Sequence, residues 1–215
     1  MSTPNESPAA PAIADPAPLG LAAFALTTFL LSAANAHWAT GTNSTTLAWL
    51  GYGLGYGGLV QLLAGMWEFK NKNVFGATAF SSYGGFWLGL YFYVKDVVAS
   101  GIAKNGLAVH HDLGWILLAW FIFNTYMMVI STQVNTAVFA VFATLGLTEL
   151  ILFIANFTIS ASDVANGDTS ALLKIGGYVG IITALTAWYT SMAGVLNGIK
   201  GKAVLPVGKP LMTIG

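Results

Sequence analysis

Long apolar stretches recur along the chain and are separated by short polar connections. A helix that crosses a bilayer needs about 20 mostly apolar residues. Six stretches meet this requirement: Leu19 to Ala36, Thr45 to Met66, Val74 to Val94, Leu113 to Ser131, Thr136 to Thr158 and Ile175 to Asn197. The sequence lacks the alternation over about ten residues that marks a strand of an outer-membrane barrel. The pattern therefore predicts an all-α membrane protein with six transmembrane helices per protomer.

The same pattern divides the chain into three parts. Residues 1–14 are rich in Pro and Ala and lack the Lys or Arg of a secretory signal, which predicts a short disordered tail. Residues 15–210 are expected to form one six-helix transmembrane transporter or channel domain. Residues 211–215 are expected to form a C-terminal tail.

Composition narrows the class of protein. Hydrophobic residues make up 56% of the chain and charged residues only 7%, whereas a soluble domain has roughly 25% charged residues. The net charge is zero and all the basic residues are lysines, so the basic face needed for nucleic-acid binding is missing. Without cysteine or any enzyme motif, the sequence predicts a membrane protein that is no enzyme and that needs no metal or cofactor.

The lysines indicate an orientation. An even number of spans puts both termini on one side of the membrane. That side collects Lys70, Lys72, Lys200, Lys202 and Lys209, and the other side has Lys95, Lys104 and Lys174. Because positive charge is enriched on the cytoplasmic side, five against three favours cytoplasmic termini in the inner or plasma membrane.

Glu149 is the one ionisable residue deep within a predicted span. A charge at that depth costs about 2.5–3.5 kcal/mol on insertion scales, so such a residue normally faces the bundle interior or water. Leu145, Glu149 and Asn156 share a helical stripe. Two interpretations remain open: a proton site or pore-lining acceptor, or a protonated carboxyl group bonded to a neighbouring helix.

Other polar residues lie within the predicted spans and can line a substrate pathway or simply bond across helices: Thr27, Thr28, Gln61, Asn124 and Asn156. The adjacent His110 and His111 are expected at the external interface, and Glu68 at the cytoplasmic interface beside Lys70. In the second span, Gly51, Gly55 and Gly58 nearly repeat the small-xxx-small spacing that allows helices to approach closely.

The first span begins with the sequence DPAPLGL. Asp15 is a good N-cap and Pro16 suits the first turn, where an amide hydrogen has no helical partner. A helix N-terminus also offers backbone donors to an anion, and Asp15 would compete for those donors. A capping role and an anion site are therefore both open.

Three blocks of residues resemble one transporter family. Asp15–Leu21 is similar to the NPAPLGL signature of the acetate uptake transporter family. Further matches to bacterial succinate–acetate permeases lie in Tyr56–Glu68 and Phe75–Trp87, and Leu205–Gly208 is similar to the family ending. The resemblance covers about residues 15 to 210, and three blocks in the right order make it specific.

The resemblance implies a six-helix bundle like that of urea channels, a homohexamer and a separate pathway in each protomer. It places a constriction at Phe24, Tyr83 and Leu145, and a helix N-terminus motif at Asp15, Pro16, Pro18 and Gly20. This chain departs from the family in two places. Asp15 replaces Asn, and Glu149 replaces an apolar residue.

The predicted function is membrane transport of acetate and related small carboxylates such as succinate, coupled to protons or channel-like, with protons and lipid as partners. An apolar constriction blocks ions by dewetting yet passes a small solute with a methyl group. The alternative is a channel for a neutral small solute such as urea or a short amide. A sensor or scaffold without flux is disfavoured, because the connections are short.

Overall fold

The computed structural model describes residues 13–38, 47–99, 105–167 and 170–212, and the helices dominate it. They are α1 (Ala17–Asn35), α2 (Ala48–Tyr52), the π-helix η2 (Gly53–Val60), α3 (Gln61–Lys70), α4 (Val74–Phe92), the π-helix η3 (Tyr93–Val98), α5 (Gly106–Ser131), α6 (Thr136–Thr158), α7 (Ala161–Ala165) and α8 (Ala171–Lys200). The helices α2, η2 and α3 form one continuous run, and α4 continues into η3. The predicted all-α class is confirmed.

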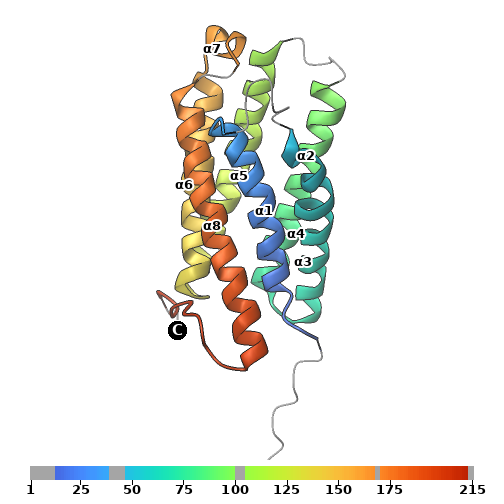
Figure 1. Ribbon diagram of the computed structural model, residues 1–215, viewed down its shortest axis with the longest axis vertical. Helices are drawn as coiled ribbons and strands as arrows, with labels where there is room; N and C mark the ends of the chain where they lie inside the picture. Colours follow the sequence, from blue (N-terminus) through green and yellow to red (C-terminus); the bar gives the residue numbers. More distant parts are fainter. Residues whose placement is uncertain (1–12, 39–46, 100–104, 168–169, 213–215) are drawn as a thin grey trace, which may run out of the picture.

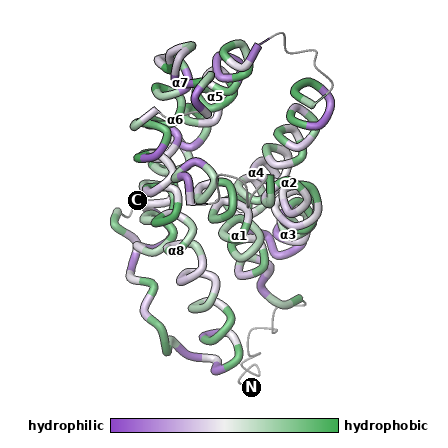
Figure 2. Tube along the Cα trace, turned by 45° about the horizontal axis from the view of Figure 1, so that its top comes forward, coloured by the Kyte–Doolittle hydropathy of each residue, from purple (hydrophilic) through white to green (hydrophobic). Residues whose placement is uncertain are grey.

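Within the described residues, four helices are long and apolar enough to cross a membrane, and the chain is a multi-pass membrane protein. These are α1, α5, α6 and α8. The α2–η2–α3 and α4–η3 runs lie alongside them in Figure 1, and hydrophobic colours cover much of the helical trace in Figure 2. The α2–η2–α3 run is broken into shorter pieces. The α4–η3 run is rich in Gly, Ser and aromatic residues, which lowers its apolarity.

Asparagine caps set the beginnings of three helices. Asn73, Asn105 and Asn135 each accept a hydrogen bond from the backbone amide three residues later, at 2.8–3.1 Å. The predicted bounds of α6 are confirmed. Helix α5 begins at Gly106, seven residues before the predicted start of the span, because the cap lies at Asn105 in a more polar stretch.

The helical runs are packed in a ring. Helix α1 packs on α8, α8 on α6 and α6 on α5, and on its other side α1 packs on η2 and α3, which pack on α4. Aromatic side chains join α4 to α5, since the rings of Tyr83 and Phe86 lie 5.3 and 5.2 Å from that of Trp120. The candidate site lies inside this ring of helices.

Glycines permit the closest approaches between helices. A Cβ on Gly177 of α8 would collide with the backbone nitrogen of Ala36, and one on Gly57 of η2 would lie 2.6 Å from the Thr27 hydroxyl. Gly51 and Gly55 have nothing within 4 Å in the described protomer, so they bring no helices of this protomer together. The π-helical winding of η2 turns Gly53, Gly57 and Gly58 inward instead.

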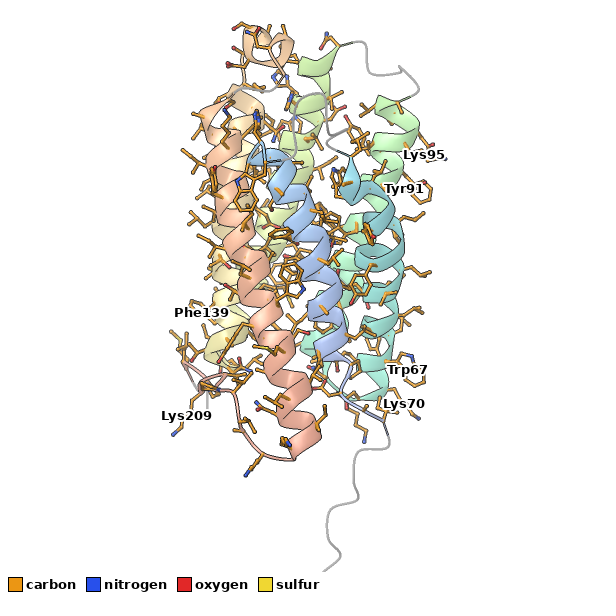
Figure 3. The ribbon with its side chains drawn as sticks, viewed as in Figure 1. Trp67, Lys70, Tyr91, Lys95, Phe139 and Lys209 are labelled. Atoms are coloured by element: carbon orange, nitrogen blue, oxygen red, sulfur yellow. The ribbon has the colours of Figure 1, made fainter. Side chains whose placement is uncertain are left out.

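The segment after α8 crosses to the start of α6. The Asn197 side chain accepts from the amides of Val204 and Leu205 at 2.7 and 2.9 Å, and the Val207 carbonyl accepts from the Ala137 amide at 2.9 Å. Lys70 and Lys209 lie at this end of the molecule and Lys95 at the other (Figure 3). Residues 1–12 of the predicted tail, residues 213–215 and Lys104 lie outside the described residues.

Replacing Gly177 by Ala is expected to destabilise the α1–α8 contact by about 1–3 kcal/mol, because the new methyl group overlaps the backbone of α1. The matched control is Gly198→Ala on the same helix, where the space is open. The midpoint of thermal aggregation in detergent, followed by size-exclusion chromatography, should fall only for Gly177→Ala. Equal midpoints for both variants would contradict the close approach.

Candidate functional site

One cavity, called cavity A, enters the helical ring from the end where α1 begins. Its volume is about 350 Å³. Near the mouth it is lined by Asp15 and by asparagines of the helix ends. Five helices contribute to it, and the lining residue farthest from the mouth on each is Phe24 of α1, Gln61 of α3, Tyr83 of α4, Leu145 of α6 and Thr190 of α8. These five residues form the floor of cavity A.

A second cavity, called cavity B, lies at the opposite end, where α5 begins and α6 ends. Its volume is about 270 Å³. Its deepest residues on three helices are Leu31 of α1, Phe86 of α4 and Leu152 of α6. The polar residues that line cavity B are Asn35, His37, His110 and Asn156. In the described part of the chain, no group of three or more potential metal-ligating side chains accompanies either cavity.

Only a thin layer of side chains separates the two cavities. Along α6, Leu145 in cavity A and Leu152 in cavity B are seven residues apart, or about 10 Å at 1.5 Å per residue. Along α4, Tyr83 and Phe86 are three residues apart, or about 4.5 Å. The layer therefore has the thickness of one to two helical turns.

The predicted constriction residues meet at the floor of cavity A. Phe24, Tyr83 and Leu145 are buried, with 6%, 4% and 7% of their surface exposed, and belong to one apolar cluster. The rings of Phe24 and Tyr83 are 5.8 Å apart, edge to face. Three residues that are distant in the sequence thus close one cavity with two aromatic rings and an isobutyl group.

A hydrogen bond fixes the Tyr83 ring. The Asn124 amide nitrogen donates to the Phe142 carbonyl at 3.0 Å, so the Asn124 oxygen faces Tyr83 and accepts from its hydroxyl group at 3.1 Å. Asn124 is fully buried and lines neither cavity. The hydroxyl proton of Tyr83 is therefore committed to Asn124, and its oxygen lone pairs remain as acceptors.

Glu149 lies in the layer between the cavities. It is one turn beyond Leu145 on α6, is 5% exposed and lines neither cavity. Its Oε2 atom has no hydrogen-bond partner among the described residues. The neighbouring Thr148 and Thr183 hydroxyls are 3.1 Å apart and connect α6 to α8. A buried acceptor without a partner is costly unless a proton, water or solute satisfies it.

The remaining predicted pathway residues divide into three positions. Gln61 lines cavity A, and its Oε1 atom is buried without a partner. Asn156 lines cavity B. Thr27 and Thr28 lie between the cavities and line neither, and the Thr27 hydroxyl donates back to the Ala23 carbonyl at 2.9 Å.

The residues of the DPAPLGL motif dock α1 against its neighbours. Helix α1 begins at Ala17, two residues before the predicted span, with Pro16 as N-cap in place of Asp15. The Asp15 side chain accepts from the Ala17 amide at 3.0 Å. The Pro18 carbonyl accepts from Ser191 of α8 at 2.6 Å. A Cβ on Gly20 would lie 2.6 Å from the Phe80 ring of α4. The position of Phe24 depends on this docking.

Two residues are more buried than the sequence indicated. His110, expected at the external interface, is 8% exposed and lines cavity B, because α5 already begins at Gly106. Its spacing to Leu113 and Leu117, which also line cavity B, was the available signal. Glu68, expected at the cytoplasmic interface, is fully buried at the α3–α4 turn, where it accepts from Asn71 at 3.0 Å.

A double-mutant cycle is expected to reveal the Tyr83–Asn124 bond. Asn124→Leu keeps the volume but strands the Tyr83 hydroxyl, whereas Tyr83→Phe removes that hydroxyl. The two effects on thermal stability should therefore be non-additive by about 0.5–3 kcal/mol. If Tyr83→Phe costs the same in both backgrounds, the bond contributes nothing to stability.

Comparison with known proteins identifies relatives of this chain. The model of the GPR1/FUN34/yaaH family matches residues 2–209. Acetate permease A of Emericella nidulans is 39% identical over 200 residues, which cover 90% of this chain and 65% of the permease. This chain thus spans less than two thirds of the length of that relative.

Two bacterial proteins match almost end to end. The succinate-acetate/proton symporter SatP of Escherichia coli is 34% identical over 197 residues, covering 92% of this chain and 96% of the symporter. The solved structure of the bacterial acetate channel SatP superposes with a TM-score of 0.76 at 33% identity, covering 91% of this chain and 99% of that one. The family expectation is confirmed: the chain belongs to the GPR1/FUN34/yaaH family.

Proposed function

We propose that this protein transports acetate and related small carboxylates through a pathway in each protomer that joins cavity A to cavity B. The observation that carries the proposal is the meeting of Phe24, Tyr83 and Leu145 at the floor of one cavity, with a second cavity entering from the opposite end. The names of the bacterial and fungal relatives support the same substrate class.

The constriction selects against a bare charge. Its walls are two aromatic rings and a leucine, and an apolar ring of this kind excludes ions by dewetting. Carboxylic acids ionise near pH 4 to 5, so a carboxylate at neutral pH must take up a proton or shed its water shell to pass. The Tyr83 oxygen, an acceptor because its proton is bonded to Asn124, suits the O–H of the protonated acid.

Glu149 is the proposed proton site of this pathway. It lies within the layer that the solute must cross, and one of its carboxyl oxygens lacks a hydrogen-bond partner in the described structure. A protonated Glu149 can pass its proton to a carboxylate at the constriction and recover one from the far side. Proton coupling through Glu149 would avoid moving net charge through an apolar ring.

The proposal includes the finer architecture expected from the sequence. The α2–η2–α3 and α4–η3 runs serve as two further spans, which makes six and puts both termini on the cytoplasmic side with Lys70 and Lys209 (Figure 3). Six protomers assemble into a homohexamer, with lipid around it and a pathway in each subunit. Gln61, Thr27, Thr28 and Asn156 border the path, and Asn124 positions Tyr83.

A neutral amide is the specific competitor for this pathway. Urea and acetamide donate N–H groups, which the Tyr83 oxygen can accept as readily as an acid O–H. They carry no charge to lose and need no proton site. Measuring the entry of urea and acetamide through the protein therefore distinguishes a channel for neutral solutes from a proton-linked carboxylate transporter.

The test is entry of labelled acetate into proteoliposomes, with and without an inward proton gradient, with urea as the parallel solute. Acetate entry should require the protein and rise several-fold with the gradient, because uptake of a proton neutralises the carboxylate. Urea entry without acetate entry would overturn the substrate assignment. Acetate entry that ignores the gradient would overturn proton coupling.

Glu149→Gln should abolish the gradient effect, since an amide keeps the shape of the side chain but cannot exchange a proton. The matched control is Glu68→Gln, which alters another buried carboxyl group that lines neither cavity. Both variants are compared with the wild-type protein at equal reconstitution. A full gradient response in Glu149→Gln would remove Glu149 from the mechanism.

Phe24→Ala should widen the constriction, because it removes one of the two rings at the floor of cavity A. Uptake of butyrate relative to acetate is expected to rise by about tenfold or more, as the two additional methylene groups of butyrate become accommodated. Phe29→Ala, on the same helix but outside the lining of both cavities, is the control. An unchanged butyrate-to-acetate ratio would exclude Phe24 from the constriction.

A further inference from the structure

Four buried polar atoms lie in or beside the layer between the two cavities and have no hydrogen-bond partner in the described part of the chain. They are Thr28 Oγ1 of α1, Gln61 Oε1 of α3, Trp87 Nε1 of α4 and Glu149 Oε2 of α6. Gln61 belongs to the floor of cavity A, and the other three side chains lie beyond it. A polar group buried without a partner is costly. The proposed pathway uses Glu149 as a proton site and gives the indole of Trp87 no role.

Thr28 and Glu149 have the same position relative to the two cavities. Thr28 is four residues after Phe24 at the floor of cavity A and three residues before Leu31, which lines cavity B. On α6, Glu149 is likewise four residues after the lining residue of cavity A and three residues before that of cavity B. Residues at i, i+4 and i+7 share one face of an α-helix. Both side chains therefore point into the space between the floors of the cavities.

Trp87 brings a hydrogen-bond donor to the same level on α4. It lies one turn after Tyr83 of the cavity A floor and directly follows Phe86, which lines cavity B. A Cβ on Gly57 would lie 2.9 Å from Cδ1 of the Trp87 indole and 2.6 Å from the Thr27 hydroxyl. Because Cδ1 is bonded to Nε1, the indole N–H lies beside α1 at the level of Thr27. The N–H of tryptophan can only donate.

The surroundings of these three side chains are closed and largely apolar. Thr28, Trp87 and Glu149 are 7%, 2% and 5% exposed and line neither cavity, so a solute meets them only after the constriction has opened. The rings of Trp49 and Phe86 lie 6.2 and 5.2 Å from that of Trp87. A polar group that arrives with a solute can satisfy the three atoms. Together they offer two hydrogen-bond donors and one carboxyl group.

We propose that Thr28, Trp87 and Glu149 form an occluded binding site for the solute between the two cavities. The ligand is a small carboxylic acid in its neutral form. The Trp87 N–H and the Thr28 hydroxyl donate to its carbonyl oxygen, and its own O–H donates to Glu149 Oε2. That O–H carries the proton that Glu149 has passed to the carboxylate, so the site neither gains nor loses a proton. The identity of the ligand rests on the proposed transport function, to which the site adds Trp87 as a binding residue.

Removing the indole N–H is expected to slow transport without weakening the fold, because its loss leaves no described group unpaired. Benzothienylalanine in place of Trp87 exchanges the N–H for sulfur and keeps the shape of the ring. Acetate entry should slow by about two- to tenfold, the effect of one neutral hydrogen bond. The same replacement at Trp115, which is 66% exposed and lines neither cavity, is the matched control. A lower midpoint of thermal aggregation for the Trp87 replacement would reveal a structural partner and overturn the proposal.

Nitrogen NMR of indole-labelled protein in nanodiscs tests binding directly. The chain contains seven tryptophans, and Trp87→Phe and Trp115→Phe assign two of their signals. At about pH 5, where part of the acetate is protonated, acetate should shift the Trp87 signal saturably and leave the Trp115 signal unchanged. Thr28→Val, which replaces the hydroxyl by a methyl group of similar size, should raise the half-saturating acetate concentration of this shift by about two- to tenfold.

The outcomes separate this site from the transport proposal. Acetate flux in proteoliposomes with no acetate-dependent shift of the Trp87 signal would overturn the site and leave transport intact. A saturable shift without flux would support the site and overturn transport. Equal shifts of the Trp87 and Trp115 signals would show non-specific binding and overturn the site. A shift of the Trp87 signal with acetamide but not with acetate would overturn the neutral acid as the ligand.

Discussion

The hydrogen bond between Tyr83 and Asn124 joins helices α4 and α5, where the helical ring closes. Helices α4 and α5 meet mainly through side chains, and Tyr83 provides both the polar link to Asn124 and an aromatic contact to Trp120. In an apolar interior, neither the hydroxyl nor the amide can be left without a partner. A bond that links α4 to α5 therefore also fixes the ring of Tyr83 at the floor of cavity A.

Among the three residues of the proposed constriction, this arrangement leaves one hydrogen-bond acceptor and no free donor. Asn124 accepts the hydrogen bond that the Tyr83 hydroxyl donates, so the tyrosine oxygen would face a solute in the proposed pathway as an acceptor. Phe24 and Leu145 offer no hydrogen bond. A neutral acid would satisfy such a surface better than an anion does. The proposed pathway thus combines two cavities, a buried carboxyl group at Glu149 and an apolar constriction that favours the neutral form.

Glycine and proline positions determine how closely the helices enclose this pathway. Gly57 and Gly177 bring η2 and α8 against α1, and Gly20 makes room for Phe80. The first turn of α1 is tied to α8 through the Pro18 carbonyl. Because Phe24 lies two turns further along α1, these contacts far from the constriction determine where its ring lies.

The sequence by itself determined the membrane class, the bounds of α6 and the family, because apolar length, charge depletion and local motifs are properties of contiguous residues. Through the family resemblance it also predicted a constriction at Phe24, Tyr83 and Leu145, which the structure brings together in the lining of one cavity. Only the tertiary structure decided that Asn124 supports Tyr83 from outside both cavities, that Glu68 is buried at a turn and that His110 faces cavity B. These roles depend on which side of each helix faces the ring. Helix starts and π-helical winding set that rotation, and small errors in either turn a residue from lipid to cavity.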